Sequence, residues 1–396
     1  MLNLQPKSSF KMMRSSINLC KVVGLWDEAN RRRRPRWQVI LLASSLILWY
    51  IIPSAAFMIR NEKVLLIQLK PTLELFAIII FTVRLFVHII TQDKLQKCYY
   101  QTHSVLNEFV DSSFEDVRSI LAHMQVSSER LVKYYTCGVM AQASIYGWVP
   151  AIITIFKYAV GTKIPELPST VLEADFVFFD QKSSFWIWLP VMAISLIVQY
   201  LMVVTMSANE CLLWNLLHHV SCTFKLITME IGKLEHWKEA AEYRVKLTRI
   251  IRHHESCYES ARLLESSLCP VMAILYCSCV LQTCYIMFVV SVVEDYIVLG
   301  SMMFVLNYTV FMIFTFSMLG TELMETSSAV SNAIYFSRWY EHSDQEQRLL
   351  LFMLKRSQKT TSISAAKFFS VTRASFAGAM RSAFSYFTVM QQTINK

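Results

Sequence analysis

Two short histidine–cysteine motifs have the residue types and the spacing to bind a metal ion. The sequence reads HHVSC at residues 218–222 and HHESC at residues 253–257, so each cysteine follows histidines by three and four positions. On a helix these positions share one face, and imidazole nitrogen with thiolate sulfur is a common ligand set for zinc. Such pairs also arise by chance on helices that pack through ordinary contacts. We favour that interpretation, so the sequence predicts no metal site.

Motifs for enzymatic chemistry are absent from the sequence. It contains no GxSxG, HExxH or P-loop motif, no aspartate pair within an apolar stretch, and none of the clustered histidine boxes of membrane desaturases. We therefore expect neither an enzyme nor a bound cofactor.

Two ionisable residues lie within an apolar stretch at residues 71–91, namely Glu74 and Arg84. Ten residues of helix separate them by about 15 Å, so the two side chains do not pair with each other. We expect Glu74 to reach the outer membrane interface and Arg84 to face the protein interior or to extend toward the inner interface. A proton-coupled transporter would need a longer chain of charges.

The elements that must position these residues are long apolar helices. Of 396 residues, 54% are hydrophobic and 17% charged, and only eight are glycine and nine proline. A soluble chain carries about 25% charged residues, and a bilayer core of about 30 Å takes about 20 residues per helix. The sequence predicts an all-α, polytopic, seven-transmembrane helical membrane protein. The expected spans are residues 37–59, 71–91, 135–157, 186–206, 269–293, 296–319 and 374–394.

The distribution of lysine and arginine predicts the orientation. The segments on one side of the expected spans hold 27 Lys and Arg, and those on the other side hold five. The positive-inside rule then places the N-terminus in the cytosol and the C-terminus outside, which is opposite to G-protein-coupled receptors. The basic run at residues 31–37, together with the net charge of +9, is a membrane anchor in this interpretation and not a nucleic-acid site. None of the ten cysteines lies in an expected outer loop, so we predict no disulfides.

The cytosolic segments are expected to be helical as well. Residues 207–268 contain a single glycine and no proline, and apolar residues recur at helical spacing toward the end of this segment. We therefore expect the fourth to seventh helices to extend into a cytosolic anchor domain. The expected units are 1–36 (cytosolic N-terminal segment), 37–206 (first four spans), 207–268 (cytosolic extension), 269–319 (fifth and sixth spans), 320–373 (anchor region) and 374–396 (last span).

The outer halves of four spans combine large apolar residues with small or polar ones. Ser144, Gly147 and Ala151 are spaced i, i+3 and i+7, so they form one stripe. Small residues on one face let a neighbouring helix approach, or they leave a void, and the sequence does not separate these alternatives. A void here would be apolar and would suit a small volatile or lipid-like ligand. The candidate ligand-binding residues are Leu75, Phe76, Ile79, Ser144, Gly147, Trp148, Ala151, Met192, Leu196, Met303 and Phe304.

The last span carries a narrow polar stripe. At 100° per residue, five polar side chains fall within an arc of about 80°. These residues are Arg381, Ser385, Thr388, Gln392 and Asn395. Such a stripe faces water or protein, so it either makes hydrogen bonds to other helices or lines a water-filled pore. A pore requires several subunits, because one helix cannot enclose it.

The C-terminal sequence resembles that of insect odorant receptors. SYFTVMQQ at residues 385–392 is similar to the final-helix motif of that family, and AAKFF at residues 365–369 is similar to the stretch that precedes it. In the related gustatory receptors the motif begins with Thr-Tyr and ends with Gln-Phe. Here Tyr386 and Gln392 keep that spacing, but Ser385 and Thr393 replace the threonine and the phenylalanine. The family's co-receptor is longer, so this chain looks like a ligand-selective tuning subunit.

The resemblance implies a function and residue roles. It implies an odorant-gated, non-selective cation channel in the plasma membrane of olfactory sensory neurons, formed as a heterotetramer with the odorant co-receptor (Orco). A small volatile apolar ligand would bind between the second, third, fourth and sixth spans, and cations would pass a pore lined by the last helices. The family's apolar gate falls on Val389, its polar ring on Gln392, and its next apolar gate position on Thr393, which departs from the pattern. With Ser385 from the polar stripe, these are the candidate pore residues.

Two alternatives remain open at this stage. One is a gustatory receptor channel that acts without a separate co-receptor. The other is a transporter or another membrane protein that is not a channel.

Overall fold

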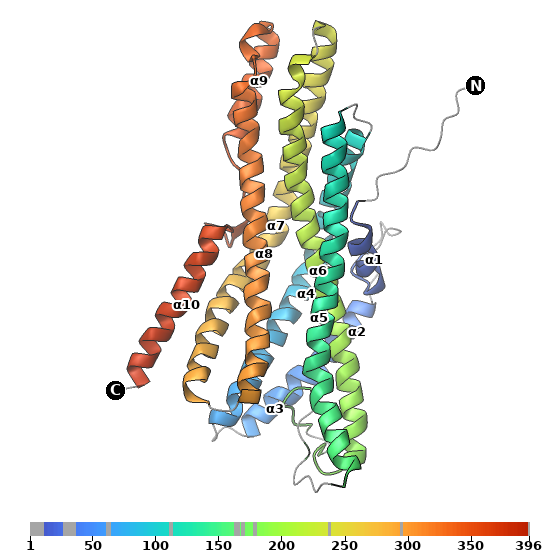
Figure 1. Cartoon of the computed structure of the whole chain (residues 1–396), viewed down its shortest axis with the longest axis vertical. Coiled ribbons are helices and arrows are strands. Elements are labelled where there is room, and N and C mark those ends of the chain that lie inside the picture. Colours follow the sequence, from blue (N-terminus) through green and yellow to red (C-terminus); the bar gives the residue numbers. More distant parts are fainter. Residues whose placement is uncertain are drawn as a thin grey trace, which may run out of the picture.

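The computed structural model is an elongated bundle of long helices (Figure 1). It describes residues 12–26, 37–60, 65–110, 114–161, 167, 171–176, 180–236, 239–293 and 296–394. Its elements are α1 (Arg14–Val22), α2 (Trp37–Leu46), η1 (Ile47–Ile51), α3 (Ile52–Arg60), α4 (Leu65–Val110), α5 (Glu115–Ala159), α6 (Phe185–Gly232), η2 (Leu234–His236), α7 (Ala240–Val292), α8 (Tyr296–Phe336), η3 (Trp339–Glu341), α9 (Asp344–Ser357), β1 (Ser364–Ala365), β2 (Phe369–Ser370) and α10 (Arg373–Ile394). The all-α prediction is confirmed. The basic run at 31–36 lies outside the described residues.

Six helical segments of the described chain are long and apolar enough to cross a membrane. They are Trp37–Arg60, Gln68–Val110, Glu115–Ala159, Phe185–Gly232, Ala240–Ser291 and Leu299–Phe336. The first six predicted spans lie within these segments, apart from the outermost residues of the fifth and sixth. The seventh predicted span coincides with α10, whose polar stripe makes it less apolar than the other six.

The helices continue well beyond the apolar spans, as expected for the fourth, fifth and sixth, since α8 also runs past residue 319 to Phe336. The seventh differs from that expectation, because α10 begins only at Arg373. Helix α6 runs past residue 206 to Gly232, and α7 begins at Ala240, far ahead of residue 269. Hydropathy did not indicate that α4 also continues to Val110 or that α5 begins at Glu115. Charged residues at 92–134 lowered the apolar signal there. Residues 92–110 and 115–134 nevertheless form helix, because the apolar side chains among them pack on neighbouring helices.

One large apolar core runs through both the apolar spans and the helical extensions beyond them. Helix α4 packs against α7, α6 packs against α8 and α5 packs against α6. Trp214 is fully buried near the middle of this core, with the ring of Tyr135 at 4.6 Å and that of Phe316 at 6.0 Å between centroids. All ten cysteines are free thiols.

The segment between α8 and α10 folds back along α8. Helix α9 starts with a capping box formed by Ser343 and Glu346, which satisfies backbone N–H groups at its first turn. The β1–β2 hairpin then passes α8 so closely that a Cβ at Gly320 would collide with the carbonyl oxygen of Val371. Helix α10 has no extension of its own and begins directly after this hairpin. In Figure 1 its C-terminal part stands apart from the bundle.

Candidate functional site

A cavity of about 190 Å³ lies among α4, α5, α6, α7 and α8, with Tyr50 and the loop residues Val171 and Leu172 also in its wall. A cavity of about 150 Å³ is enough to hold benzene, so this one has room for a small organic molecule. The remaining lining residues are Glu74, Ala77, Ile78, Ile80, Phe81, Arg84, Val139, Gln142, Ala143, Tyr146, Gln199, Met202, Val203, Met206, Leu275, Ser278, Gln282, Phe304, Val305, Tyr308 and Thr309.

Glu74 lies in the wall of this cavity. Its side chain is only 6% exposed, so the expectation that it reaches the membrane interface is wrong. The hydroxyl of Tyr146 donates a hydrogen bond to Glu74 Oε1, and the ammonium of Lys70 lies 3.6 Å from the same oxygen. These two donors compensate the burial of the carboxylate. Its second oxygen, Oε2, is buried without a hydrogen-bond partner.

Arg84 lines the same cavity and forms an ion pair with Glu210 of α6. Both side chains are almost fully buried, so Arg84 faces the protein interior as expected. Glu74 and Arg84 do not pair with each other, because each has a partner on a different helix. Glu210 was missed in the sequence, since it lies just past the apolar span. A buried arginine requires an acid nearby, and that requirement was the available signal.

Three glutamines add further polar groups to the wall. Gln142 donates to the carbonyl of Phe304 at 3.1 Å, and Gln282 accepts from the Thr309 hydroxyl at 2.6 Å. Gln199 donates through Nε2 to the carbonyl of Ala143 at 3.2 Å, which identifies Oε1 as its free acceptor. That oxygen is buried and has no partner. The lining residues therefore carry two unpartnered acceptors, Glu74 Oε2 and Gln199 Oε1, and two further unpartnered groups, Arg84 Nε and the Tyr308 hydroxyl.

The four helices named from the sequence all line this cavity, but mostly through other residues. Of the eleven candidates, Phe304 is in its wall. Leu75 and Phe76 are half-buried, whereas Ile79 and Met303 are 40% and 50% exposed. Trp148, Ala151, Met192 and Leu196 line a separate apolar groove between α2, α5 and α6. Sequence periodicity identified these four helices but not their rotation about their own axes. It did not identify α7 as a lining helix, although α7 contributes Leu275, Ser278 and Gln282.

The stripe of small residues on α5 is where this helix packs against α6. A Cβ on Gly147 would lie 2.7 Å from the Leu196 side chain, so only glycine permits this approach. The Ser144 hydroxyl is 2.6 Å from the hydroxyl of Tyr200, and the Trp148 indole donates to that hydroxyl at 2.9 Å. Of the two alternatives for the stripe, close helix packing is the one observed.

Helix α10 turns its small side chains toward its own chain and its polar stripe away. Ala379 and Ala383 are buried, and at 100° per residue they lie about 160° from Arg381, on the opposite face. Arg381, Ser385, Val389, Gln391 and Gln392 are exposed. The Thr388 hydroxyl donates to the Phe384 carbonyl of its own helix at 2.9 Å. Asn395 and the side chain of Thr393 lie outside the described residues.

The cavity and the start of α10 contact different sides of α7. Leu275 and Ser278 of α7 line the cavity, and Tyr276 points to the other side. The Tyr276 hydroxyl lies 2.7 Å from the Ser317 hydroxyl of α8 and 2.9 Å from the Ser375 hydroxyl in the first turn of α10. A molecule that displaces α7 from within the cavity would therefore act on the start of α10.

Comparison with known proteins gives a family match over most of the chain. A family profile described as "7tm Odorant receptor" matches residues 70–384. Two structures of the insect olfactory receptor OR5 from Machilis hrabei, one in complex with eugenol, superpose with TM-scores of 0.75 and 0.76. They cover 96% of this chain and 97% of the receptor, at 17% and 18% sequence identity, so they show the same fold.

Curated relatives match over shorter stretches. The odorant receptor coreceptor of Drosophila melanogaster is 36% identical over 87 residues, which are 22% of this chain and 18% of the coreceptor. Odorant receptor 10 of Aedes albopictus is 23% identical over 174 residues, which are 43% of this chain and 45% of that receptor. The alignment thus spans about a fifth of the coreceptor's length and under half of the receptor's.

Proposed function

Since this chain belongs to the insect odorant receptor family, a family of odorant-gated channels, we propose that it is a ligand-selective tuning subunit of a heteromeric cation channel. The extent of the alignments supports this role over that of a co-receptor. The alignment with the Drosophila coreceptor covers 22% of this chain, whereas the alignment with odorant receptor 10 covers 43% of it.

The observation that carries the proposal is the cavity beside α7. A ligand in the cavity contacts α7 from one side, and Tyr276 holds the first turn of α10 from the other side. A ligand that binds better when α10 is displaced shifts the population toward the open channel. The polar face of α10 would then line the pore together with the last helices of other subunits, with Val389 at the gate and Gln392 in the polar ring.

The polar groups of the cavity favour one chemical class of ligand. Four buried polar atoms of the lining residues lack a hydrogen-bond partner: the acceptors Glu74 Oε2 and Gln199 Oε1, the donor Arg84 Nε, and the Tyr308 hydroxyl, which can do either. The rest of the wall is mostly apolar. Lys70 lies beside the Glu74 carboxylate, which disfavours a cationic ligand. The ligand is therefore a small, mainly apolar molecule with one neutral hydroxyl group, which can both donate and accept a hydrogen bond, such as a volatile alcohol or a phenol.

Co-expression tests the function. The chain is expressed with and without the odorant co-receptor, and currents are recorded over a panel of odorants. We expect odorant-evoked cation currents only with both chains. A tastant-gated current from this chain alone would favour a gustatory type of channel, and saturable uptake without channel events would favour a transporter. Either result contradicts the tuning-subunit assignment.

A matched pair of ligands tests the chemistry of the cavity. Glu74→Leu removes an acceptor, so it should raise the concentration for half-maximal activation by an active alcohol about tenfold to hundredfold, as expected for a hydrogen bond to a charged group. The methyl ether of the same alcohol should be affected little. Ile79→Ala, on the outward side of α4, is the control. Equal effects of Glu74→Leu on alcohol and ether would contradict the assignment.

The pore assignment has its own test. Gln392→Ala should change the relative permeability of sodium, potassium and calcium ions. Gln391→Ala, also exposed on α10 but outside the polar stripe, should leave it unchanged. Unaltered permeability in the Gln392 variant would remove this residue from the pore.

A further inference from the structure

The two histidine–cysteine motifs have similar sequences but different surroundings. In the motif at 253–257, the donor atoms meet separate neighbours. His253 Nε2 lies 2.9 Å from Glu108 Oε2, the His254 ring packs on Tyr258, and Cys257 is buried in the core. This motif is a set of packing contacts, as favoured from the sequence.

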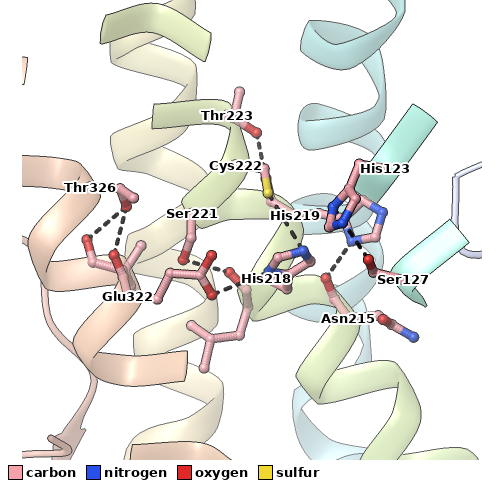
Figure 2. Close-up of polar contacts among 12 residues, drawn as sticks. His123, Ser127, Asn215, His218, His219, Ser221, Cys222, Thr223, Glu322 and Thr326 are labelled. Carbon is pink, nitrogen blue, oxygen red and sulfur yellow. Dashed lines mark hydrogen bonds and ion pairs between the residues drawn. The ribbon is translucent and has the colours of Figure 1, made fainter. Parts of the chain in front are cut away.

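In the motif at 218–222, a third donor from another helix joins the first two. His218 and Cys222 lie one turn apart on α6, and Glu322 of α8 faces them (Figure 2). His218 Nδ1 is 3.2 Å from Glu322 Oε2, and His218 Nε2 is 3.6 Å from Cys222 Sγ. One donor atom from each residue lies within 4.8 Å of the other two. Within the described chain, this is the group of three that meets the requirement for a shared ion.

The separation between His218 Nε2 and Cys222 Sγ fits a shared zinc ion. Zinc bound tetrahedrally at about 2.0–2.1 Å from nitrogen and about 2.3 Å from sulfur places these two atoms about 3.5–3.6 Å apart. The observed separation of Nε2 and Sγ is 3.6 Å. Glu322 is at the surface, with its side chain 36% exposed, so its carboxylate can rotate toward the thiol without disturbing the core. We propose that His218, Cys222 and Glu322 form a zinc site that joins α6 to α8, with water as the fourth ligand.

The neighbouring histidine is not part of this set. His219 is fully buried, and its Nδ1 lies 2.6 Å from the carbonyl of Asn215, away from Glu322 (Figure 2). The second histidine of the motif is therefore a packing residue in both copies of the pattern.

The site is placed to influence α10. Thr321 and Glu325, which flank Glu322 on α8, both hold the first residue of α10. The Thr321 hydroxyl accepts from the Arg373 backbone N–H at 3.0 Å, and the Glu325 carboxylate pairs with the Arg373 guanidinium at 2.8 Å. An ion that ties Glu322 to α6 restrains this turn of α8 and, through it, the base of α10. Zinc bound here is expected to alter channel opening from the side that the charge distribution assigns to the cytosol.

Cobalt spectroscopy of the purified full chain tests the site directly. Co²⁺ replaces zinc in such sites, and its bond to a thiolate gives a charge-transfer band in the near ultraviolet. We expect this band in the unmodified chain, displacement of the band by Zn²⁺, and loss of the band in Cys222→Ser. Glu322→Gln should weaken Co²⁺ binding about tenfold or more. Cys257→Ser, in the other motif, is the matched control and should retain the full signal.

Three results would overturn the proposal: no thiolate band in the unmodified chain, a band that survives Cys222→Ser, or unchanged Co²⁺ affinity in Glu322→Gln. Glu322 is on the surface, so its glutamine variant should fold normally even if the buried cysteine does not tolerate substitution. Size-exclusion elution of each variant verifies the folded state. With Zn²⁺ applied to the inner face of membrane patches, only variants that keep the site should show a change in current.

Discussion

Many polar side chains in the interior of the bundle are buried and paired within the chain, whereas several of those on the terminal helix are exposed. In the interior, Arg84 pairs with Glu210 and Glu74 accepts from Tyr146, all within one chain and away from solvent. On α10 the stripe residues Arg381, Ser385 and Gln392 are exposed, and the helix touches the rest of the chain through its first turn and the face that carries Ala379 and Ala383. The bundle is thus complete in one subunit, whereas α10 presents a face that other molecules must cover.

The aromatic residues of α10 support the same distinction. Phe384 and Tyr386 are 61% and 60% exposed, and Val389 is 60% exposed. In the bundle, by contrast, large side chains such as Trp214 and Phe316 are buried among neighbouring helices. A helix that is polar on one side and aromatic on another has to meet water, lipid and protein on different faces. This is the arrangement that the pore hypothesis requires of each subunit.

The largest effect is expected from breaking the interior ion pair. Glu210→Ala leaves the Arg84 guanidinium buried without its counter-charge, which should destabilise the folded chain by about 3–5 kcal/mol. The measurement is the midpoint of thermal denaturation in a fixed detergent. Glu325→Ala, which breaks the exposed pair with Arg373, is the control and should cost about 1 kcal/mol or less. Equal losses would mean that the interior pair is no more important than a surface one.

A smaller effect is expected where α5 meets α6. Gly147→Ala inserts a methyl group against Leu196 and Gln199, so it should destabilise the chain by about 1–3 kcal/mol. Gly138→Ala on the same helix meets nothing within 4 Å and should stabilise it by about 0.5–1 kcal/mol through helix propensity. Thermal midpoints that move in the same direction for both variants would contradict the packing described for Gly147.

The smallest effect on the isolated chain is expected on α10. Phe384→Ser removes an exposed ring, so the thermal midpoint should move by no more than the equivalent of about 0.5 kcal/mol. Co-purification with the odorant co-receptor should fall, because the ring is available to a neighbouring subunit in the proposed channel. A large loss of stability with unchanged co-purification would show that this face of α10 serves its own chain.

Much of the architecture was accessible from the sequence because the physical signals are local. Residues 186–206 are apolar enough to predict a span, and the scarcity of glycine and proline after residue 206 predicts that the helix continues, as α6 does to Gly232. The polar stripe of α10 follows from the helical period alone. The cavity was less accessible, since a rotation of one residue separates Ile79, which points outward, from Ile78 and Ile80, which line it.

The sequence by itself determined that this chain forms long membrane-spanning helices, because hydropathy and helical period act over short stretches of backbone. It also determined that the last helix has one polar face. Only the tertiary structure decided which groups share a site. Glu210 reaches Arg84 across 126 positions in the sequence, and Glu322 reaches His218 across 104. The sequence pattern HHxxC was the same at 218–222 and 253–257. Carboxylates from other helices reach a histidine in both motifs, but within the described residues only His218, Cys222 and Glu322 bring a histidine, a cysteine and a carboxylate within 4.8 Å of one another.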